Sequence, residues 1–171
     1  MLPAINDMAK IGSKIFAVGD LGTIKVSSDG GTTWSDLAVG LTSRSFLSIH
    51  GAGGTIIACG LNGINPGGAL VRSTDGVTFS LLSIPKRMEN RLIPPAMVDR
   101  RMFDVQMVTA LVGYMGCDWG AVLKTTDGGL SWSVQQLPTG AIVHAVSFID
   151  ELNGMVVGDY GICFVTSNGG V

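Results

Sequence analysis

The amino-acid sequence predicts an all-β protein built from four copies of a small antiparallel sheet. Three observations support this fold class. Glycine is abundant, with 25 copies in 171 residues, and charged residues make up only 14% of the chain, against about 25% in an average soluble domain. Short apolar runs alternate with turn signals, and one turn motif recurs four times. A helical bundle or a disordered chain would have a different composition.

The recurring turn motif begins with Ser or Thr, continues with Asp-Gly or Asn-Gly and ends on an aromatic residue. It reads SSDGGTTW, STDGVTF and TTDGGLSW, and a fourth copy reads TSNGG. Its anchor residues are Asp29, Asp75, Asp127 and Asn168, at spacings of 46, 52 and 41 residues. Seven positions before each anchor lies a glycine: Gly22, Gly68, Gly120 and Gly161. Self-similarity in one register predicts a repeat architecture.

Each repeat contains the apolar runs of a four-stranded antiparallel meander. Three runs precede the turn and one short run follows it, which is the size and layout of a β-propeller blade. We expect a single β-propeller domain over 1–171, with blades at 5–40, 44–84, 102–138 and 142–171. The fourth blade stops within its turn, so about 3.7 blades are predicted. Because open edges and apolar faces are costly, we expect a longer chain or a homo-oligomer to complete the ring.

The turn motif has a physical rationale. The anchor carboxylate accepts backbone N–H groups, the following glycines supply positive φ, and a hydroxyl returns to the turn. The aromatic residue is expected to be largely buried and to pack over its hairpin or against the next blade. The predicted structural turn residues are Asp29, Gly31, Thr33, Trp34, Asp75, Gly76, Thr78, Phe79, Asp127, Gly129, Ser131, Trp132 and Asn168.

The motif resembles the Asp-box (BNR) repeat. The stretches VGDLGTIKVSSDGGTTW and SFIDELNGMVVGDYGICFVTSNGG are similar to repeats of the photosystem II stability/assembly factor family. This resemblance implies a β-propeller without known catalysis, typically with seven blades. Asp boxes also occur in sialidases, sortilin-type receptors and carbohydrate-active enzymes, so the resemblance is more specific for fold than for function.

The longest interval between anchors contains a basic insertion, residues 85–101. It holds five of the 11 basic residues of the chain: Lys86, Arg87, Arg91, Arg100 and Arg101. A basic loop on an otherwise acidic body predicts a docking site for an acidic protein surface. The alternative is a solvated loop whose arginines pair with neighbouring acids.

Three functions are compatible with these patterns. The first is a non-enzymatic scaffold for protein–protein interaction or complex assembly. The second is a structural component of a phage virion, a phage tail or a surface assembly, and the third is a glycan-binding or sialidase-like propeller. We expect no enzyme activity, because the sequence contains no recognisable pair of catalytic carboxylates. No cofactor is predicted. His50 and His144 match in position and are interpreted as strand residues, and Asp20 and Asp159 as turn residues, so no metal site is predicted.

Net charge and hydropathy exclude further classes of partner and location. The net charge of −2 argues against a nucleic-acid partner. The uncharged stretch Val105–Cys117 is too short to span a membrane, and no signal peptide is visible, which leaves the compartment open. The three cysteines, Cys59, Cys117 and Cys163, follow no disulfide or metal spacing and are predicted to be buried free thiols.

Overall fold

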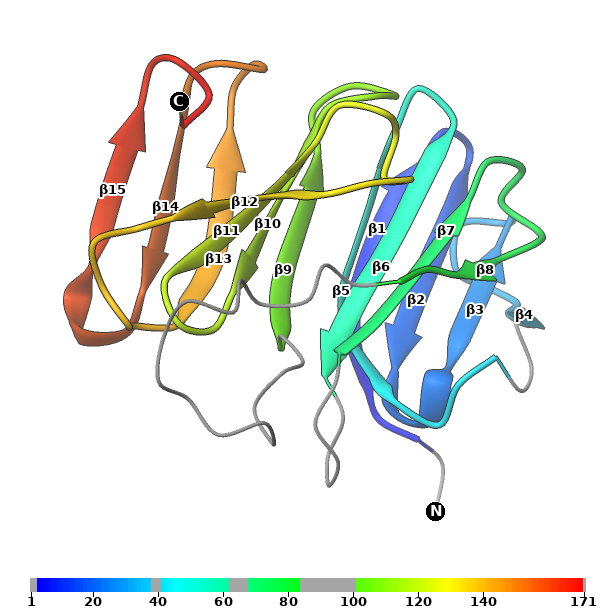
Figure 1. Cartoon of the computed structure of the whole chain (residues 1–171). Helices are drawn as coiled ribbons and strands as arrows, with labels where there is room; N and C mark the ends of the chain where they lie inside the picture. Colours follow the sequence, from blue (N-terminus) through cyan, green and yellow to red (C-terminus); the bar gives the residue numbers. More distant parts are fainter. Residues whose placement is uncertain (1–2, 38–40, 62–67, 84–100, 171) are drawn as a thin grey trace.

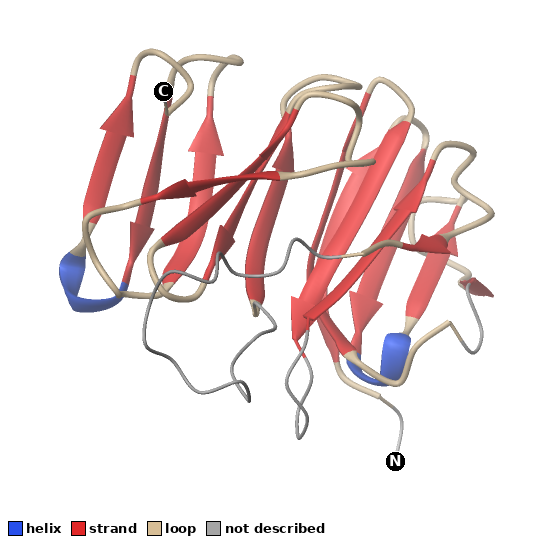
Figure 2. Ribbon diagram, in the orientation of Figure 1, coloured by secondary structure: helices blue, strands red, loops and turns tan. Residues whose placement is uncertain are grey.

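The computed structural model describes residues 3–37, 41–61, 68–83 and 101–170. Four antiparallel sheets stand in a row along the chain, each formed by consecutive strands (Figure 1). The predicted all-β propeller architecture is confirmed, with three sheets of four strands and a last sheet of three. Regular helix within the described residues is confined to short 3₁₀ turns (Figure 2), and no helix there is long and apolar enough to cross a membrane.

The strands follow one another in sequence order within every sheet. The first sheet contains β1 (Ile5–Ile11), β2 (Lys14–Gly19), β3 (Ile24–Ser27) and β4 (Ser35–Leu37). The second contains β5 (Ser45–Ala52), β6 (Thr55–Leu61), β7 (Gly68–Ser73) and β8 (Ser80–Leu81). The third contains β9 (Met102–Met107), β10 (Gly113–Cys117), β11 (Ala121–Thr125) and β12 (Ser133–Gln136). The fourth contains β13 (Val143–Phe148), β14 (Gly154–Gly158) and β15 (Cys163–Thr166).

Apolar side chains fill the space between each sheet and the next. Phe16 and Val18 of the first sheet pack with Ile49 of the second, all at most 2% exposed. Similar clusters join the second sheet to the third and the third to the fourth. Both faces of the two central sheets are therefore buried along their middle strands β6, β7, β10 and β11, and these strands are buried at nearly every position.

Polar side chains tie the first strand of each sheet to the first strand of the next. The Asp7 carboxylate accepts the Ile49 N–H at 2.9 Å, and the Asp104 carboxylate accepts the Val146 N–H at 2.8 Å. Between the second and third sheets, the His50 ring Nδ1 accepts the Met107 N–H at 3.2 Å. These bonds satisfy N–H groups at a strand edge and fix how neighbouring sheets are aligned.

His50 and His144 both lie in the first strand of a sheet, β5 and β13. The prediction that they match in position is wrong, because the strand register makes Ser147 the counterpart of His50. Burial lowers the pKa of His50, which favours the neutral ring that its acceptor role requires. Cys59 and Cys117 are buried, as expected, and burial raises the pKa of the Cys59 thiol. The prediction for Cys163 is wrong because this residue is exposed. It lies on the face of the fourth sheet that no other described sheet covers.

Candidate functional site

The Asp-box turns connect the third and fourth strands of the first three sheets. At Asp127, the carboxylate accepts the Ser131 N–H at 2.9 Å and the Ser131 hydroxyl at 2.6 Å. Asp29 binds Thr33 in the same way, while Asp75 accepts the backbone N–H groups of Val77 and Thr78. These hydrogen bonds hold the pKa of all three carboxyl groups below their usual range. The anchor aspartates therefore stabilise the conformation of their own turns.

The fourth copy of the turn keeps part of this geometry. The Thr166 hydroxyl donates to Asn168 Oδ1 at 2.8 Å, and the Gly170 N–H donates to the same oxygen at 3.2 Å. An amide has a single acceptor oxygen, so this turn lacks the second acceptor that the aspartates provide.

Two of the aromatic residues that end the motif, Phe79 and Trp132, pack on the preceding sheet, so the expectation of packing against the next blade is wrong. The Phe79 ring lies 6.4 Å from the ring of Phe16, and Trp132 joins the cluster that contains Ile57. Phe79 and Trp132 are 5% and 8% exposed, but Trp34 is 37% exposed, so the prediction of a largely buried Trp34 is wrong. No described sheet packs on the side of the first sheet where Trp34 lies, so its ring is in contact with solvent.

We expect Asp127→Asn to lower the melting temperature at neutral pH. One carboxylate oxygen of Asp127 accepts the Ser131 N–H and the other accepts the Ser131 hydroxyl, whereas an amide has only one acceptor oxygen. The pKa of Asp127 is depressed in the folded state, so its contribution is present above the unfolded pKa of about 3.9 and is lost as pH falls through the folded pKa. Thermal melts of both proteins should therefore differ at pH 7 and converge in acid. A gap of constant size at all pH values would contradict this role. Asp36→Asn, at an exposed position, is the control.

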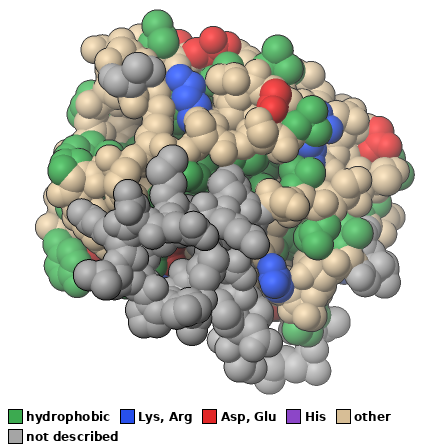
Figure 3. Space-filling model, viewed as in Figure 1, with side chains coloured by type: hydrophobic (Ala, Val, Ile, Leu, Met, Phe, Trp, Pro, Cys, Tyr) green, Lys and Arg blue, Asp and Glu red, His purple; other side chains and the backbone are tan. Residues whose placement is uncertain are grey.

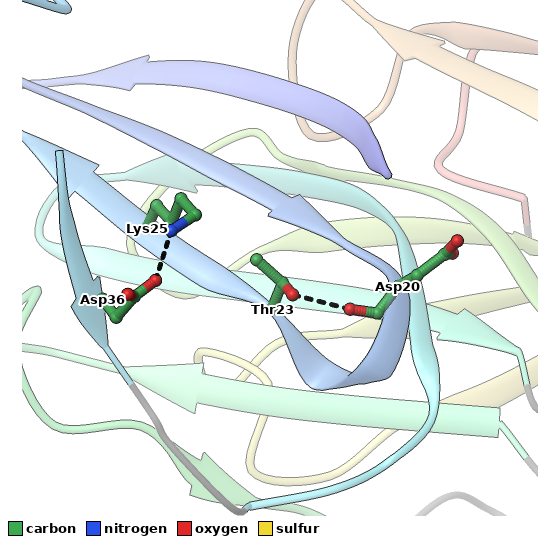
Figure 4. Close-up of polar contacts among 4 residues, drawn as sticks. All are labelled: Asp20, Thr23, Lys25 and Asp36. Atoms are coloured by element: carbon green, nitrogen blue, oxygen red, sulfur yellow. Dashed lines mark hydrogen bonds and ion pairs between the residues drawn. The ribbon is translucent and has the colours of Figure 1, made fainter. Parts of the chain in front are cut away.

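A second set of turns follows β2, β10 and β14. Each has the sequence Asp-x-Gly: Asp20-Leu21-Gly22, Asp118-Trp119-Gly120 and Asp159-Tyr160-Gly161. The first and last are the 3₁₀ turns η1 and η3, which lie at the same end of the molecule (Figure 2). The backbone carbonyl of each aspartate accepts an N–H three residues later, and at Asp20 it also accepts the Thr23 hydroxyl (Figure 4).

The middle residue of each Asp-x-Gly turn has a left-handed backbone. Leu21, Trp119 and Tyr160 have φ values of 57°, 60° and 59°, and they are the described non-glycine residues with positive φ. A left-handed backbone costs a bulky residue about 1–2 kcal/mol relative to glycine. The three side chains are nevertheless exposed, by 68%, 36% and 95%. Strained backbone positions of this kind cluster at functional sites, which makes these three exposed residues candidates for one.

Polar and aromatic groups flank these turns between the third and fourth sheets. The Arg101 guanidinium lies 3.2 Å from the Asp118 carboxylate and 5.9 Å from the Phe103 ring centre. Phe103 meets the His144 ring edge-on at 5.4 Å, and His144 Nε2 lies 2.7 Å from an Asp159 carboxylate oxygen. We call the following residues the Asp-x-Gly rim: Leu21, Trp119 and Tyr160 with Arg101, Phe103 and His144.

Sequence reasoning found only part of this rim. Asp20 and Asp159 were expected to form turns, but the exposed residue after each aspartate was not singled out. The available signal was the recurrence of Asp-x-Gly seven to nine positions before three of the four Asp-box anchors, with a large side chain at x.

Of the basic insertion, residues 85–101, the structure describes only Arg101. Lys86, Arg87, Arg91 and Arg100 lie outside the described residues. Arg101 contacts Asp118, whose side chain is 5% exposed. Arg101 is therefore engaged with a buried carboxylate, and reversing its charge would place two carboxylates together.

A cavity of about 320 Å³ lies between the third and fourth sheets. Its lining includes Phe148, Val156 and Phe164, with Gln135 and Gln136 as polar groups. The lining carries no acidic side chain, so it offers no pair of carboxylates for acid–base chemistry. Within the part of the chain that the structure describes, no three His, Cys, Asp or Glu residues gather as a metal site.

No protein-family profile and no curated protein matches the sequence. Solved structures do match. YCF48 bound to a D1 peptide is 18% identical with a TM-score of 0.67, over 92% of this chain and 47% of that chain. YCF48 from Cyanidioschyzon merolae is 17% identical with a TM-score of 0.66, over 96% and 51%. This chain thus spans about half the length of these two proteins.

Two further matches differ in nature. A GH74 xyloglucanase from Xanthomonas campestris is 17% identical with a TM-score of 0.68, over 94% of this chain and 27% of that chain. The computationally designed Ika4 protein is 13% identical with a TM-score of 0.67, over 99% and 94%. At these identities the likeness shows the fold, which is that of a β-propeller.

Proposed function

We propose that this chain is a non-enzymatic β-propeller module that binds a segment of another protein through the Asp-x-Gly rim. The observation that carries the proposal is the set of three bulky side chains held in solvent on a left-handed backbone. A protein keeps such strain where the exposed side chain has a use.

The composition of the rim fits a protein ligand. Tryptophan, tyrosine and arginine are the residues that contribute most binding energy at protein interfaces. Here Trp119 and Tyr160 provide exposed apolar surface, and Arg101 and His144 provide polar groups beside it. The similar fold of YCF48, in a structure with a D1 peptide bound, supports a peptide segment as the ligand.

The ligand we propose is acidic. Five of the 11 basic residues of the chain lie in 85–101, which leads directly into the rim at Arg101. Clustered positive charge attracts acidic segments and speeds their association, an effect that salt screens over about 8–10 Å.

Selection from a display library of random peptides tests this function. We expect the selected peptides to be enriched in Asp and Glu and to bind less tightly as salt is added. Tyr160→Asn should weaken binding roughly tenfold, the effect of losing about 1.4 kcal/mol at a contact residue. Its melting temperature should be unchanged or higher, because asparagine tolerates the left-handed backbone.

Two comparisons make the binding test specific. Reversing Lys86, Arg87, Arg91 and Arg100 to Glu should abolish the acidic preference, with Arg101 kept because it contacts Asp118. Val77→Ala alters an exposed apolar residue in an Asp-box turn and should leave binding unchanged. Selected peptides that bind the Tyr160 variant and the charge-reversed variant as well as the natural chain would rule out the rim as the site.

Glycoside hydrolysis is the second candidate, because GH74 enzymes share the fold. Glycosidases need a pair of free carboxyl groups at the scissile bond. Around the rim, the carboxylates of Asp118 and Asp159 instead contact Arg101 and His144. We expect no release of reducing sugar from xyloglucan. Measurable hydrolysis that tracks with purified protein would favour the enzyme.

A further inference from the structure

We infer that the outer faces of the first and fourth sheets are the two halves of one docking surface, and that a second copy of this chain occupies it head to tail. Three internal contacts join neighbouring sheets, and each is built by apolar residues at the same strand positions. Apolar residues occupy these positions on the two outer faces as well, but there they are exposed. The inference is independent of the rim, which lies at one end of the sheets.

The outer face of the fourth sheet has the features of a forward-packing face. Strand register makes Met155 the counterpart of Phe16, Ile57 and Tyr114, because each residue stands one position after the partner of the Asp-box Ser or Thr. Those three counterparts are at most 1% exposed, whereas Met155 is 41% exposed. Val157 and Val165 on the same face are 38% and 76% exposed.

Apolar atoms at the surface are visible on this side of the molecule. Figure 3 shows hydrophobic side chains along the left-hand edge, the side on which Figure 1 places β15. Exposed apolar side chains that share one sheet face are typical of an interaction surface.

The outer face of the first sheet has the features of a backward-packing face. Met8 corresponds in register to Ile49, Val105 and Val146, which are at most 7% exposed, yet Met8 is 60% exposed. Ile5 is 43% exposed, and Trp34 is the exposed counterpart of the buried Phe79 and Trp132. In the internal contacts, the backward face of one sheet covers the forward face of the sheet before it. Trp34 would accordingly pack near Met155 of the other copy.

The strand-edge hydrogen bonds are compatible with this contact. Met8 N–H, the counterpart of the N–H groups that bond to a preceding sheet, is satisfied by its own Asp7 carboxylate at 2.8 Å. Ser147 occupies the position of His50 and Gln106, which accept N–H groups from the following sheet. Its hydroxyl offers the same acceptor to Lys10 N–H of a second copy. No buried N–H group would be left without a partner at these positions.

A second copy is the occupant because each chain carries one forward face and one backward face. Neither face resembles itself, so the contact is head to tail, and each copy brings the half that the other needs. Both faces are apolar at the matching positions, as the internal contacts are.

The test is the mass of the full chain in solution, measured by light scattering across micromolar concentrations. We expect species of two or more copies of the 17.7 kDa chain. Met155→Asp and Met8→Lys should each give a folded monomer, checked by circular dichroism. Mixing the two variants should restore association, because one copy then keeps an intact forward face and the other an intact backward face.

Leu130→Asp is the matched control, because Leu130 is an exposed apolar residue of an Asp-box turn outside both end sheets. It should associate like the natural chain. A natural chain that stays monomeric, or association that neither Met155→Asp nor Met8→Lys weakens, would overturn the inference.

Discussion

Trp132→Ala is expected to destabilise the protein by about 3–5 kcal/mol, the usual cost of removing a large buried aromatic side chain. Trp132 is 8% exposed, packs with Ile57 of the preceding sheet and donates its indole N–H to the Gly129 carbonyl at 3.1 Å. Its removal leaves a cavity between the second and third sheets.

Trp34→Ala is the matched comparison, because Trp34 makes the same indole bond, to Gly31 at 3.0 Å, in the same turn motif. Trp34 is 37% exposed and no other described sheet packs against it, so its loss should cost about 1 kcal/mol. Both changes should be measured by urea unfolding in the Met155→Asp background, so that association of copies does not contribute. Equal losses for the two tryptophans would show that the turn, and not the sheet–sheet contact, determines their contribution.

The fold was predictable because its signals are local. An Asp-Gly turn and the apolar runs around it lie within a few residues of one another, and their repetition gave the sheets and their order. The Asp-box hydrogen bonds follow from the same short segment, as Asp127 and Ser131 illustrate.

What the sequence did not reveal depends on residues far apart in the chain. Whether Trp34 or Cys163 is buried is decided by the neighbouring sheet, which the motif does not describe. The exposed residues of the rim were not singled out for another reason: Leu21 and Tyr160 are residue types that seldom adopt a left-handed backbone, so the recurring Asp-x-Gly marks the turn without revealing their conformation. The bond between Asp104 and Val146 joins residues 42 positions apart.

Asp104→Ala is expected to cost about 3 kcal/mol, because the Asp104 carboxylate holds two neighbouring sheets at once. It accepts the Ser48 hydroxyl of the second sheet at 2.9 Å and the Val146 N–H of the fourth at 2.8 Å. Hydrogen bonds to a charged group contribute about 1.5–3 kcal/mol each, and alanine leaves both donors without this acceptor.

Asp104→Asn should lose less than Asp104→Ala, because the amide keeps one acceptor oxygen for one of the two donors. Asp36→Ala is the control, since Asp36 makes a single ion pair with Lys25 and its side chain is 62% exposed (Figure 4). An exposed pair contributes at most about 1 kcal/mol. Urea unfolding of the three variants should therefore rank Asp104→Ala as the least stable, then Asp104→Asn, then Asp36→Ala. If Asp104→Ala were no less stable than Asp36→Ala, apolar packing alone would hold the sheets together and the carboxylate would only set their alignment.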